Sequence, residues 1–303
     1  SGFLALCTAN FPDPAIDPAK DDPPSDYFNT VLYTGNSSTQ SITGVGFQPD
    51  WVWIKNRPQS DPHVLTDSVR GVTKEIQSNE STQQTTNADG LTAFGADGFS
   101  LGDDVAYNTD TENYVSWNWK AGTSFSNDAS ATGIGTIDST GSVSTEAGFS
   151  IVSYQGNGTD DATVKHGLSQ KPELCIIKNL GAATNWDVSF EGISGGTSLN
   201  LDTDASVFSP TLGFHQRGTQ VLTLKDGSSG RTRVNTNSQN YIAYCFYSVD
   251  GYSKISTYKG NGSADGTFVF TGFRPAWLLV KRVDGGSESF NIVDNKRNPF
   301  NGA

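Results

Sequence analysis

Three segments of the chain share one sequence pattern, and this repeat limits the possible folds more than any other feature. Each copy has a Tyr, a Gly-Asn pair, a Gly followed by Phe or Leu, a Pro, and an apolar run that ends in Lys. The repeated tyrosines, Tyr33, Tyr154 and Tyr258, lie 121 and 104 residues apart. A pattern that keeps its order three times at similar spacing indicates tandem copies of one structural unit.

The apolar run of each copy predicts a β-strand that is buried on both faces. The runs cover residues 51–54, 174–177 and 277–280 and are apolar at every position, whereas a strand with one wet face alternates. The Pro in front of each run begins the strand, where no ladder donor is lost. We expect the lysines that end the runs, Lys55, Lys178 and Lys281, to reach solvent.

The first two copies also share a closing strand that the third lacks. Residues 114–119 and 241–246 both begin with Tyr and carry aromatic side chains at their fourth and sixth positions. The third copy stops at Ala303 before any such strand, and a half sandwich would leave an apolar face bare. Either the protein continues past Ala303 or something else supplies that surface. The absence of Met, position 1 included, likewise predicts that the chain begins inside a longer product.

The polar background favours strands and turns over helix. The 33 glycines and the 11% of aromatic residues lie among many Thr, Ser, Asn and Asp, which suit pleated strands and tight turns. No long window has apolar residues at helical spacing. We therefore predict an all-β fold of tandem concanavalin-like or jelly-roll β-sandwich repeats, the last one incomplete.

Repeats and composition together divide the chain into five segments. Residues 1–26 are expected to be the end of a preceding domain plus a Pro-rich linker, and residues 27–122 the first sandwich. A Ser/Thr/Gly-rich linker over 123–147, with an edge strand around 133–137 as the alternative, leads to the second sandwich over 148–251. A partial third sandwich covers 252–303.

The net charge excludes two classes of partner. A formal charge of −12 and a pI of about 4.6 would repel a phosphate backbone and an anionic membrane surface. The longest apolar runs are also too short to span a bilayer. We predict no nucleic-acid partner and no membrane insertion.

No pattern in the sequence predicts catalysis, a metal or a cofactor. His63, His166 and His215 have no second His or Cys at metal-ligand spacing, and no Gly-x-Ser-x-Gly stands on a strand-to-helix turn. Paired carboxylates from distant strands stay possible. We predict a non-enzymatic protein with no catalytic, cofactor or metal residues, its ligand-binding residues being unknown. His63 falls where the other copies have Trp186 and Phe290, so we expect it to pack as an aromatic residue.

The cysteines, tryptophans and Asp-rich turns have structural explanations. Cys7, Cys175 and Cys245 lie in apolar segments and are expected to be small buried residues without a disulfide framework. The tryptophans fall on predicted core positions. The turns at 103–104, 160–161 and 202–204 match no calcium-binding loop. A glycan site would therefore have to come from loops such as 59–62 or 108–113.

Several segments resemble a known group of phage proteins. The resemblance is carried by residues 1–12, 27–35, 44–55, 67–71, 97–102, 148–152, 251–254 and 258–266, which include Gly-Phe-Gln-Pro-Asp-Trp at 46–51. They are similar to uncharacterised repeat domains in tail-fibre and other virion proteins of marine bacteriophages, over essentially the whole chain. The resemblance implies jelly-roll units in a long oligomeric fibre of the virion. The second copy departs from it at 188–192, where the first copy has Asp67 and Arg70 in its 67–71 motif.

We interpret the chain as a structural and adhesive virion protein of a tail fibre or a tail-associated component. Its expected partners are other copies of itself, as in a trimer, other virion proteins, and a glycan of the host cell surface. One alternative is a carbohydrate-binding module array of a secreted or tailspike-type enzyme. Another is a fibre or filament subunit that binds no ligand.

Overall fold

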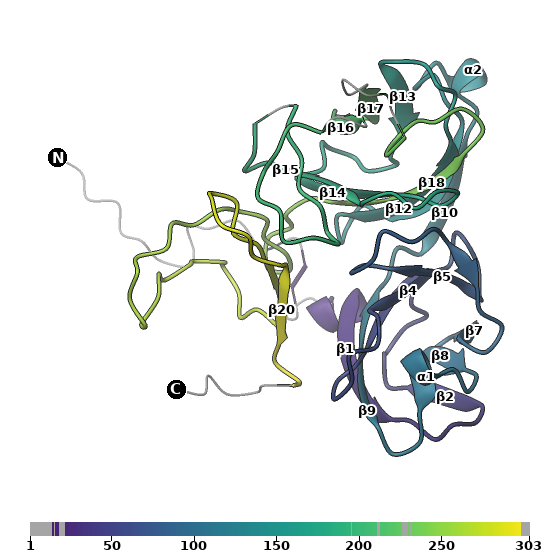
Figure 1. Ribbon diagram of the computed structural model, residues 1–303, viewed down its shortest axis with the longest axis vertical. Coiled ribbons are helices and arrows are strands. Elements are labelled where there is room, and N and C mark those ends of the chain that lie inside the picture. Colours follow the sequence, from purple (N-terminus) through teal and green to yellow (C-terminus); the bar gives the residue numbers. More distant parts are fainter. Residues whose placement is uncertain are drawn as a thin grey trace.

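The computed structural model describes residues 14, 16–17, 22–194, 196–210, 213–225, 230 and 232–297. The chain is nearly all β, and its antiparallel sheets confirm the predicted all-β sandwich fold. Two sandwiches lie one above the other, and a separate two-stranded sheet packs beside them (Figure 1). No helix in these ranges is long and apolar enough to cross a membrane. Most of the predicted segment 1–26, Cys7 included, lies outside the described residues.

The first sandwich pairs a six-stranded sheet with a three-stranded one. The first large sheet has the order β1 (Phe28–Thr34), β9 (Asn113–Trp119), β3 (Trp51–Asn56), β4 (Val64–Asp67), β5 (Lys74–Gln77) and β6 (Thr85–Thr86). Facing it are β2 (Gln40–Thr43), β8 (Gly98–Leu101) and β7 (Leu91–Gly95). The short helices η3 (Pro24–Asp26) and α1 (Val105–Asn108) precede β1 and β9. Val52, Ile54 and Tyr114 meet Ile42 and Phe99 in the core between the two sheets.

The second sandwich is built in the same way. The second large sheet has the order β10 (Thr123–Asn127), β11 (Ser139–Ser144), β12 (Phe149–Gln155), β18 (Asn240–Phe246), β14 (Leu174–Asn179) and β15 (Asp187–Phe190). Its partner sheet consists of β13 (Ala162–Lys165), β17 (Val221–Lys225) and β16 (Phe214–Arg217). The core between them contains Tyr154, Ile177 and Ala243 from the large sheet and Val164 and Leu222 from the small one.

Four consecutive strands of each large sheet have matching order and pairing. The order β1-β9-β3-β4 corresponds to β12-β18-β14-β15, and every pair is antiparallel. Trp51 lies opposite Trp119 in the first sheet, as Leu174 lies opposite Phe246 in the second. The sequence segments that resemble each other therefore occupy corresponding places in the two sheets.

The two large sheets pack face to face through a buried layer, here called the central layer. Its buried members are Trp51, Trp53, Leu65, Ile76, Val115, Trp117, Trp119 and Ala121 from the first sandwich and Phe149, Ile151, Ile176, Trp186, Val188, Leu199, Leu201, Ile242 and Tyr244 from the second. Trp51 stacks on Tyr244 with ring centres 4.3 Å apart. The central layer explains why β3 and β14 are apolar on both faces, since one face meets the small sheet and the other meets the neighbouring sandwich.

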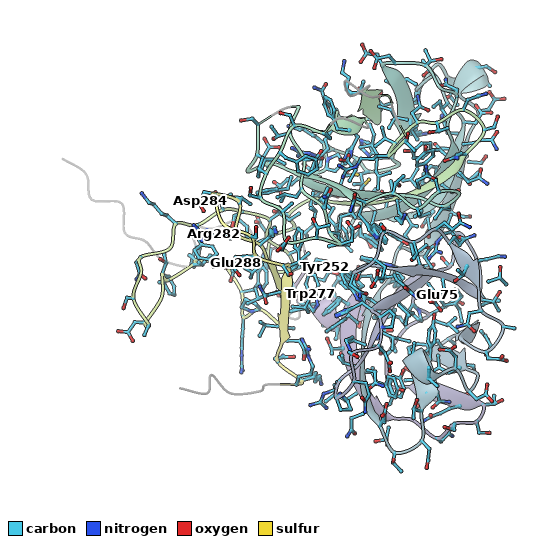
Figure 2. All side chains as sticks on the ribbon, in the orientation of Figure 1. Glu75, Tyr252, Trp277, Arg282, Asp284 and Glu288 are labelled. Carbon is cyan, nitrogen blue, oxygen red and sulfur yellow. The ribbon has the colours of Figure 1, made fainter. Side chains whose placement is uncertain are left out.

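The third copy of the repeat forms a separate sheet, here called the third sheet, with two described strands, β19 (Trp277–Val280) and β20 (Asn291–Asp294). Trp277 packs on Trp119 and Phe28 of the first sandwich, at ring distances of 5.3 and 6.2 Å. Figure 2 shows Trp277 between the third sheet and that sandwich. One face of this sheet thus adjoins the central layer. Burial on both faces is not observed here, because Leu278 is 42% exposed.

The predicted linker over 123–147 is wrong. These residues form β10, the short helix α2 (Ala129–Thr132) and β11, which extend the second large sheet beyond β12. Phe125 packs on the core of the second sandwich, and a Cβ at Gly141 would lie 2.6 Å from its ring. In the range 133–137, where an edge strand was the alternative prediction, Ile137 makes a single parallel bridge to Val164. The composition of this segment is that of a flexible linker. The few apolar residues among its Ser, Thr and Gly are nevertheless sufficient for two strands at the edge of the sheet.

Lys178 does not reach solvent as predicted. Its side chain is buried, and Nζ donates to the carbonyl oxygens of Thr184 at 2.9 Å, Asn179 at 3.1 Å and Ser81 at 3.2 Å. Burial lowers the pKa of Lys178 to about 8. The Ser81 carbonyl belongs to the first sandwich, so this lysine joins the two sandwiches. Lys55 and Lys281 are half-buried.

The two described cysteines lie opposite each other on β14 and β18. Cys175 and Cys245 are unpaired and fully buried, with their Sγ atoms 3.3 Å apart, as expected for small buried residues. Burial raises the pKa of the Cys175 thiol. Thiolate is the reactive form, so we expect neither thiol to react with a disulfide reagent in the native protein. Both should react in urea, and rapid labelling without denaturant would contradict this packing.

Candidate functional site

A buried aspartate joins the two sandwiches across the central layer. Asp67, at the end of β4, is fully buried and accepts a hydrogen bond of 2.7 Å from the Tyr244 hydroxyl on β18. Its Oδ2 also accepts from Arg70 Nε at 2.5 Å, and Arg70 donates on to the carbonyl oxygens of Leu65 and Lys74. Burial alone would lower the pKa of Arg70, but the Asp67 carboxylate raises it overall. The buried charges are therefore paired and hydrogen-bonded.

A second aspartate repeats this arrangement between the third sheet and the first sandwich. Trp117 on β9 donates from Nε1 to Asp294 Oδ2 at 3.1 Å, and Arg297 Nε lies 2.5 Å from the same oxygen. The Arg297 guanidinium also lies 5.0 Å from the centre of the Trp117 ring. This second Asp-x-x-Arg motif was not predicted. Its signal was present, because Asp67 and Asp294 each end a strand and each precede an Arg by three residues.

A cavity of about 550 Å³ lies where the two sandwiches meet the third sheet. Its lining side chains come from all three parts of the fold: Trp53, Lys55, Arg57, His63, Ser78 and Asn79, then Leu201, Asp202 and Thr203, then Leu279, Ser289, Phe290, Asn291, Ile292 and Arg297. Among them, Lys55, Arg57 and Arg297 are cations, against the single carboxylate of Asp202. Arg297 is paired with Asp294, so the excess of positive charge comes from Lys55 and Arg57. The cavity therefore combines a small excess of positive charge with aromatic walls in a chain whose net charge is −12.

His63 packs as an aromatic residue in the wall of this cavity. Its ring is stacked on Trp117 at 6.3 Å, and Trp53 Nε1 donates to its Nδ1 at 3.0 Å. The neutral ring therefore carries its proton on Nε2. Burial, together with Lys55 and Arg297, lowers the pKa of His63 to about 4. At neutral pH His63 therefore adds no charge to the cavity.

The fold brings together the two loops in which a glycan site was expected. Residues 59–62 follow Arg57 and lead to His63, both of which line the cavity. Gln59 Nε2 in that loop donates to Glu112 Oε1 in the 108–113 loop at 2.7 Å. The first loop flanks the cavity, and the second contacts the first.

We expect His63 to make the stability of the protein depend on pH between 6.5 and 4. The unfolded histidine takes up a proton near pH 6.5, whereas the folded one does so only near pH 4. The free energy of unfolding should therefore fall as the pH falls through this window, by up to about 3 kcal/mol from His63. Urea unfolding at several pH values measures the effect.

His63→Phe is the matched variant, because Phe290 stands at the corresponding place of the third copy. The difference in unfolding free energy between the native protein and this variant should change across the window. Another buried histidine, His166, also has a pKa lowered to about 4 by burial, and it is present in both proteins. Parallel pH profiles of the two proteins would contradict the prediction.

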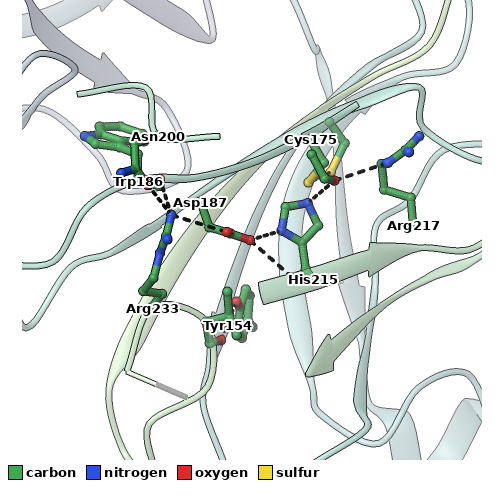
Figure 3. A network of polar contacts seen from close by, with 11 residues as sticks. Tyr154, Cys175, Trp186, Asp187, Asn200, His215, Arg217 and Arg233 are labelled. Carbon is green, nitrogen blue, oxygen red and sulfur yellow. Dashed lines mark hydrogen bonds and ion pairs between the residues drawn. The ribbon is translucent and has the colours of Figure 1, made fainter. Parts of the chain in front are cut away.

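A second candidate site is a buried Ser-His-Asp group in the second sandwich. Figure 3 shows its Asp187 between His215 and Arg233. His215 Nδ1 lies 2.5 Å from Asp187 Oδ2, and His215 Nε2 lies 2.8 Å from Ser189 Oγ. Asp187 also pairs with Arg233 at 3.3 Å. Burial alone would raise the pKa of Asp187, but Arg233 and His215 lower it overall. The order of contacts is that of the catalytic triad of serine hydrolases, and it was not predicted.

The surroundings of Ser189 argue against catalysis. Ser189 is 5% exposed and lies within β15, opposite Cys175 of β14, whereas a nucleophile must reach a substrate carbonyl. Arg217 Nε donates to its Oγ at 3.2 Å, and Ser189 lines neither the cavity at the junction nor a smaller one beside β11. The group therefore ties β15 to β16 inside the sandwich. Asp187 and Ser189, two residues apart on one strand face, were its only sequence signal.

The three Asp-rich turns that were considered for calcium each contain an aspartate with a structural role. Asp104 caps α1, Asp161 pairs with Lys225, and Asp202 accepts hydrogen bonds from Asn185 and the Trp186 amide. In the described ranges, no three His, Cys, Asp or Glu side chains are placed to hold a metal ion.

Residues 23–303 match a family model described as a domain of unknown function, DUF7483. The chain belongs to this family. Comparisons with curated proteins and with solved structures gave no match.

Proposed function

We propose that this member of the DUF7483 family is a non-enzymatic structural part of a bacteriophage virion, from a tail fibre or a tail-associated protein. The observation that carries the proposal is the central layer, which joins two sandwiches face to face through aromatic residues such as Trp51 and Tyr244. The resemblance to virion repeat domains supplies the phage context. The expected partners are other copies of the chain and other virion proteins.

The central layer supports a spacing role because it makes two sandwiches one rigid unit. Domains joined only by a linker move relative to each other, whereas a large apolar interface suppresses that motion. Here buried tryptophans and hydrogen bonds such as Tyr244 to Asp67 cross the interface. A fibre built of such units would transmit force along its length without bending at each domain boundary.

The non-enzymatic part of the proposal is tested at Ser189. A fluorophosphonate probe labels activated serines, so we expect none of it on Ser189 in the native chain. A buried, hydrogen-bonded serine cannot reach the probe. Labelling of Ser189 that disappears in His215→Ala, with folding of the variant confirmed by circular dichroism, would overturn the proposal and indicate a hydrolase.

A second candidate function, binding of acidic host glycans, is favoured by the cavity at the junction. Its cations suit a carboxylated or sulfated sugar, and Trp53 and Phe290 offer apolar walls. Arg57 is exposed and lines the cavity, so Arg57→Gln changes its charge without disturbing the core. Lys259→Gln is the matched control, because Lys259 is exposed and does not line the cavity.

A glycan array read with these variants distinguishes the candidates. Saturable binding of acidic glycans that Arg57→Gln weakens and Lys259→Gln does not would support an adhesive role. Equal loss in both variants would indicate only general charge attraction. Absence of binding by the folded chain would favour a fibre or filament subunit without a ligand. Binding of neutral plant-type polysaccharides would instead favour a carbohydrate-binding module.

A further inference from the structure

The strands β9 and β18 occupy corresponding places in their sheets and share one pattern of aromatic residues. Each lies between two antiparallel neighbours, β9 between β1 and β3, and β18 between β12 and β14. Trp117 and Trp119 point one way along β9 into the central layer, and Tyr114 points the other way into the sandwich core. The strand type is thus Tyr-x-x-aromatic-x-aromatic, with Val or Ile at its second position and small or polar residues at its third and fifth positions.

Among the described residues, the third sheet has a counterpart of β3, one of the two neighbours of β9, but no strand of this type. β19 corresponds by sequence to β3 and β14, and it pairs along one edge with β20, as β3 pairs with β4. Its other edge, the one that β9 occupies in the first sheet, has no partner strand in the described ranges. A free edge beside an apolar face is a template for pairing with another strand.

The face next to this edge is apolar and exposed. Leu278 on β19 is 42% exposed and Val293 on β20 is 49% exposed, whereas Val52, which corresponds to Leu278, is 1% exposed in the first sandwich. Further apolar residues of the third segment are exposed as well: Tyr258, Phe268, Val269 and Phe270. Leu278 and Val293 lie opposite each other on one face of this sheet, and apolar side chains exposed together in this way are typical of an interaction site. The opposite face of β19 is already fixed, because Trp277 packs on Trp119.

We propose that this edge of β19, which has no partner strand among the described residues, accepts a strand of the Tyr-x-x-aromatic-x-aromatic type. This strand pairs antiparallel with residues 277–280, as β9 and β18 pair with their neighbours. Its Tyr and small residues cover Leu278 and Val293, and its two other aromatic side chains extend the layer around Trp277. The proposal concerns polypeptide recognition and does not rest on the virion function proposed above.

A second folded copy of the chain is a poor donor of this strand. Both β9 and β18 are hydrogen-bonded along both edges within their own sheets, so releasing either would unfold a sandwich. The occupant is therefore a peptide segment of this pattern that is not already paired. A synthetic peptide with the sequence of residues 239–247, with Ser in place of Cys245, is a suitable probe.

The test measures binding of this peptide, fluorescently labelled, to the 303-residue chain. We expect saturable binding and slower amide hydrogen exchange at residues 277–280, with no change in β4. A control peptide of the same composition, with its aromatic residues at consecutive positions, should not bind, because consecutive side chains of a strand point to opposite faces. Equal binding of both peptides would overturn the proposal.

Two exposed positions provide matched variants. Leu278→Asp should weaken binding by at least about ten-fold, because it places a charge under the incoming strand. Val105→Asp should not, since Val105 is 64% exposed on α1 in the first sandwich, outside the third sheet. Both substitutions lie on the surface, so the variants should fold. Undiminished binding by Leu278→Asp, absence of peptide binding, or self-association of the chain through β19 would each overturn the proposal.

Discussion

Replacing Asp67 by Ala should lower the free energy of unfolding by about 3–5 kcal/mol, the usual cost of removing one partner from a buried ion pair. The carboxylate is fully buried and accepts hydrogen bonds from Arg70 and Tyr244. Without it, the Arg70 guanidinium, only 3% exposed, keeps its charge in an apolar region with no counter-ion. Equilibrium unfolding in urea, followed by tryptophan fluorescence, measures the loss.

Two control variants separate the charge from the hydrogen bond. Tyr244→Phe removes only the hydroxyl that donates to Asp67 and should cost about 1 kcal/mol. Asp110→Ala removes an exposed carboxylate and should change stability by less than about 0.5 kcal/mol. A loss in Asp67→Ala no larger than that in Tyr244→Phe would mean that the buried pair contributes nothing beyond one hydrogen bond.

Replacing Trp51 by Ala should cost about 3–5 kcal/mol and should also uncouple the two sandwiches. Trp51 is 2% exposed and contacts Tyr244, Phe149 and Phe246 of the second sandwich. The cavity left by its indole lies at the interface itself, so the two sandwiches lose three aromatic contacts that join them. In calorimetry we expect one unfolding transition for the native chain and two for the variant.

Trp277→Ala is the matched control for this result. Trp277 corresponds to Trp51 in sequence, but it joins the third sheet to the first sandwich and does not lie between the two sandwiches. It should cost less, because Trp277 is only partly buried, and it should leave the single main transition intact. A single transition in Trp51→Ala at a lowered temperature would show that other contacts suffice to couple the sandwiches.

Only separate parts of the cavity at the junction could be predicted from the sequence. The loop 59–62 was named as a place for a glycan, and it leads into the cavity wall at His63. Arg297 and Asp202 could not be assigned to that cavity from sequence, because they come from parts of the chain far from His63. The Ser189, His215 and Asp187 group was missed for the same reason, as His215 lies 28 residues from Asp187 and on the opposite sheet.

The sequence by itself determined the strands that pack on both faces. The runs 51–54 and 174–177, apolar at every position, predict two apolar neighbours, and both have them. The run 277–280 has one apolar neighbour among the described residues. The repeat also placed the Trp and Tyr partners of the first two runs in the core. Only the tertiary structure decided what those neighbours are. Residues as far apart as Asp67 and Tyr244, 177 positions along the chain, meet in the central layer. Lys178 is buried because its Nζ donates to the Ser81 carbonyl oxygen of the other sandwich. Residues 123–147 form strands because β11 pairs with β12 at the edge of the second large sheet. Side-chain periodicity records whether a face is buried, but the element that buries it is set by long-range packing.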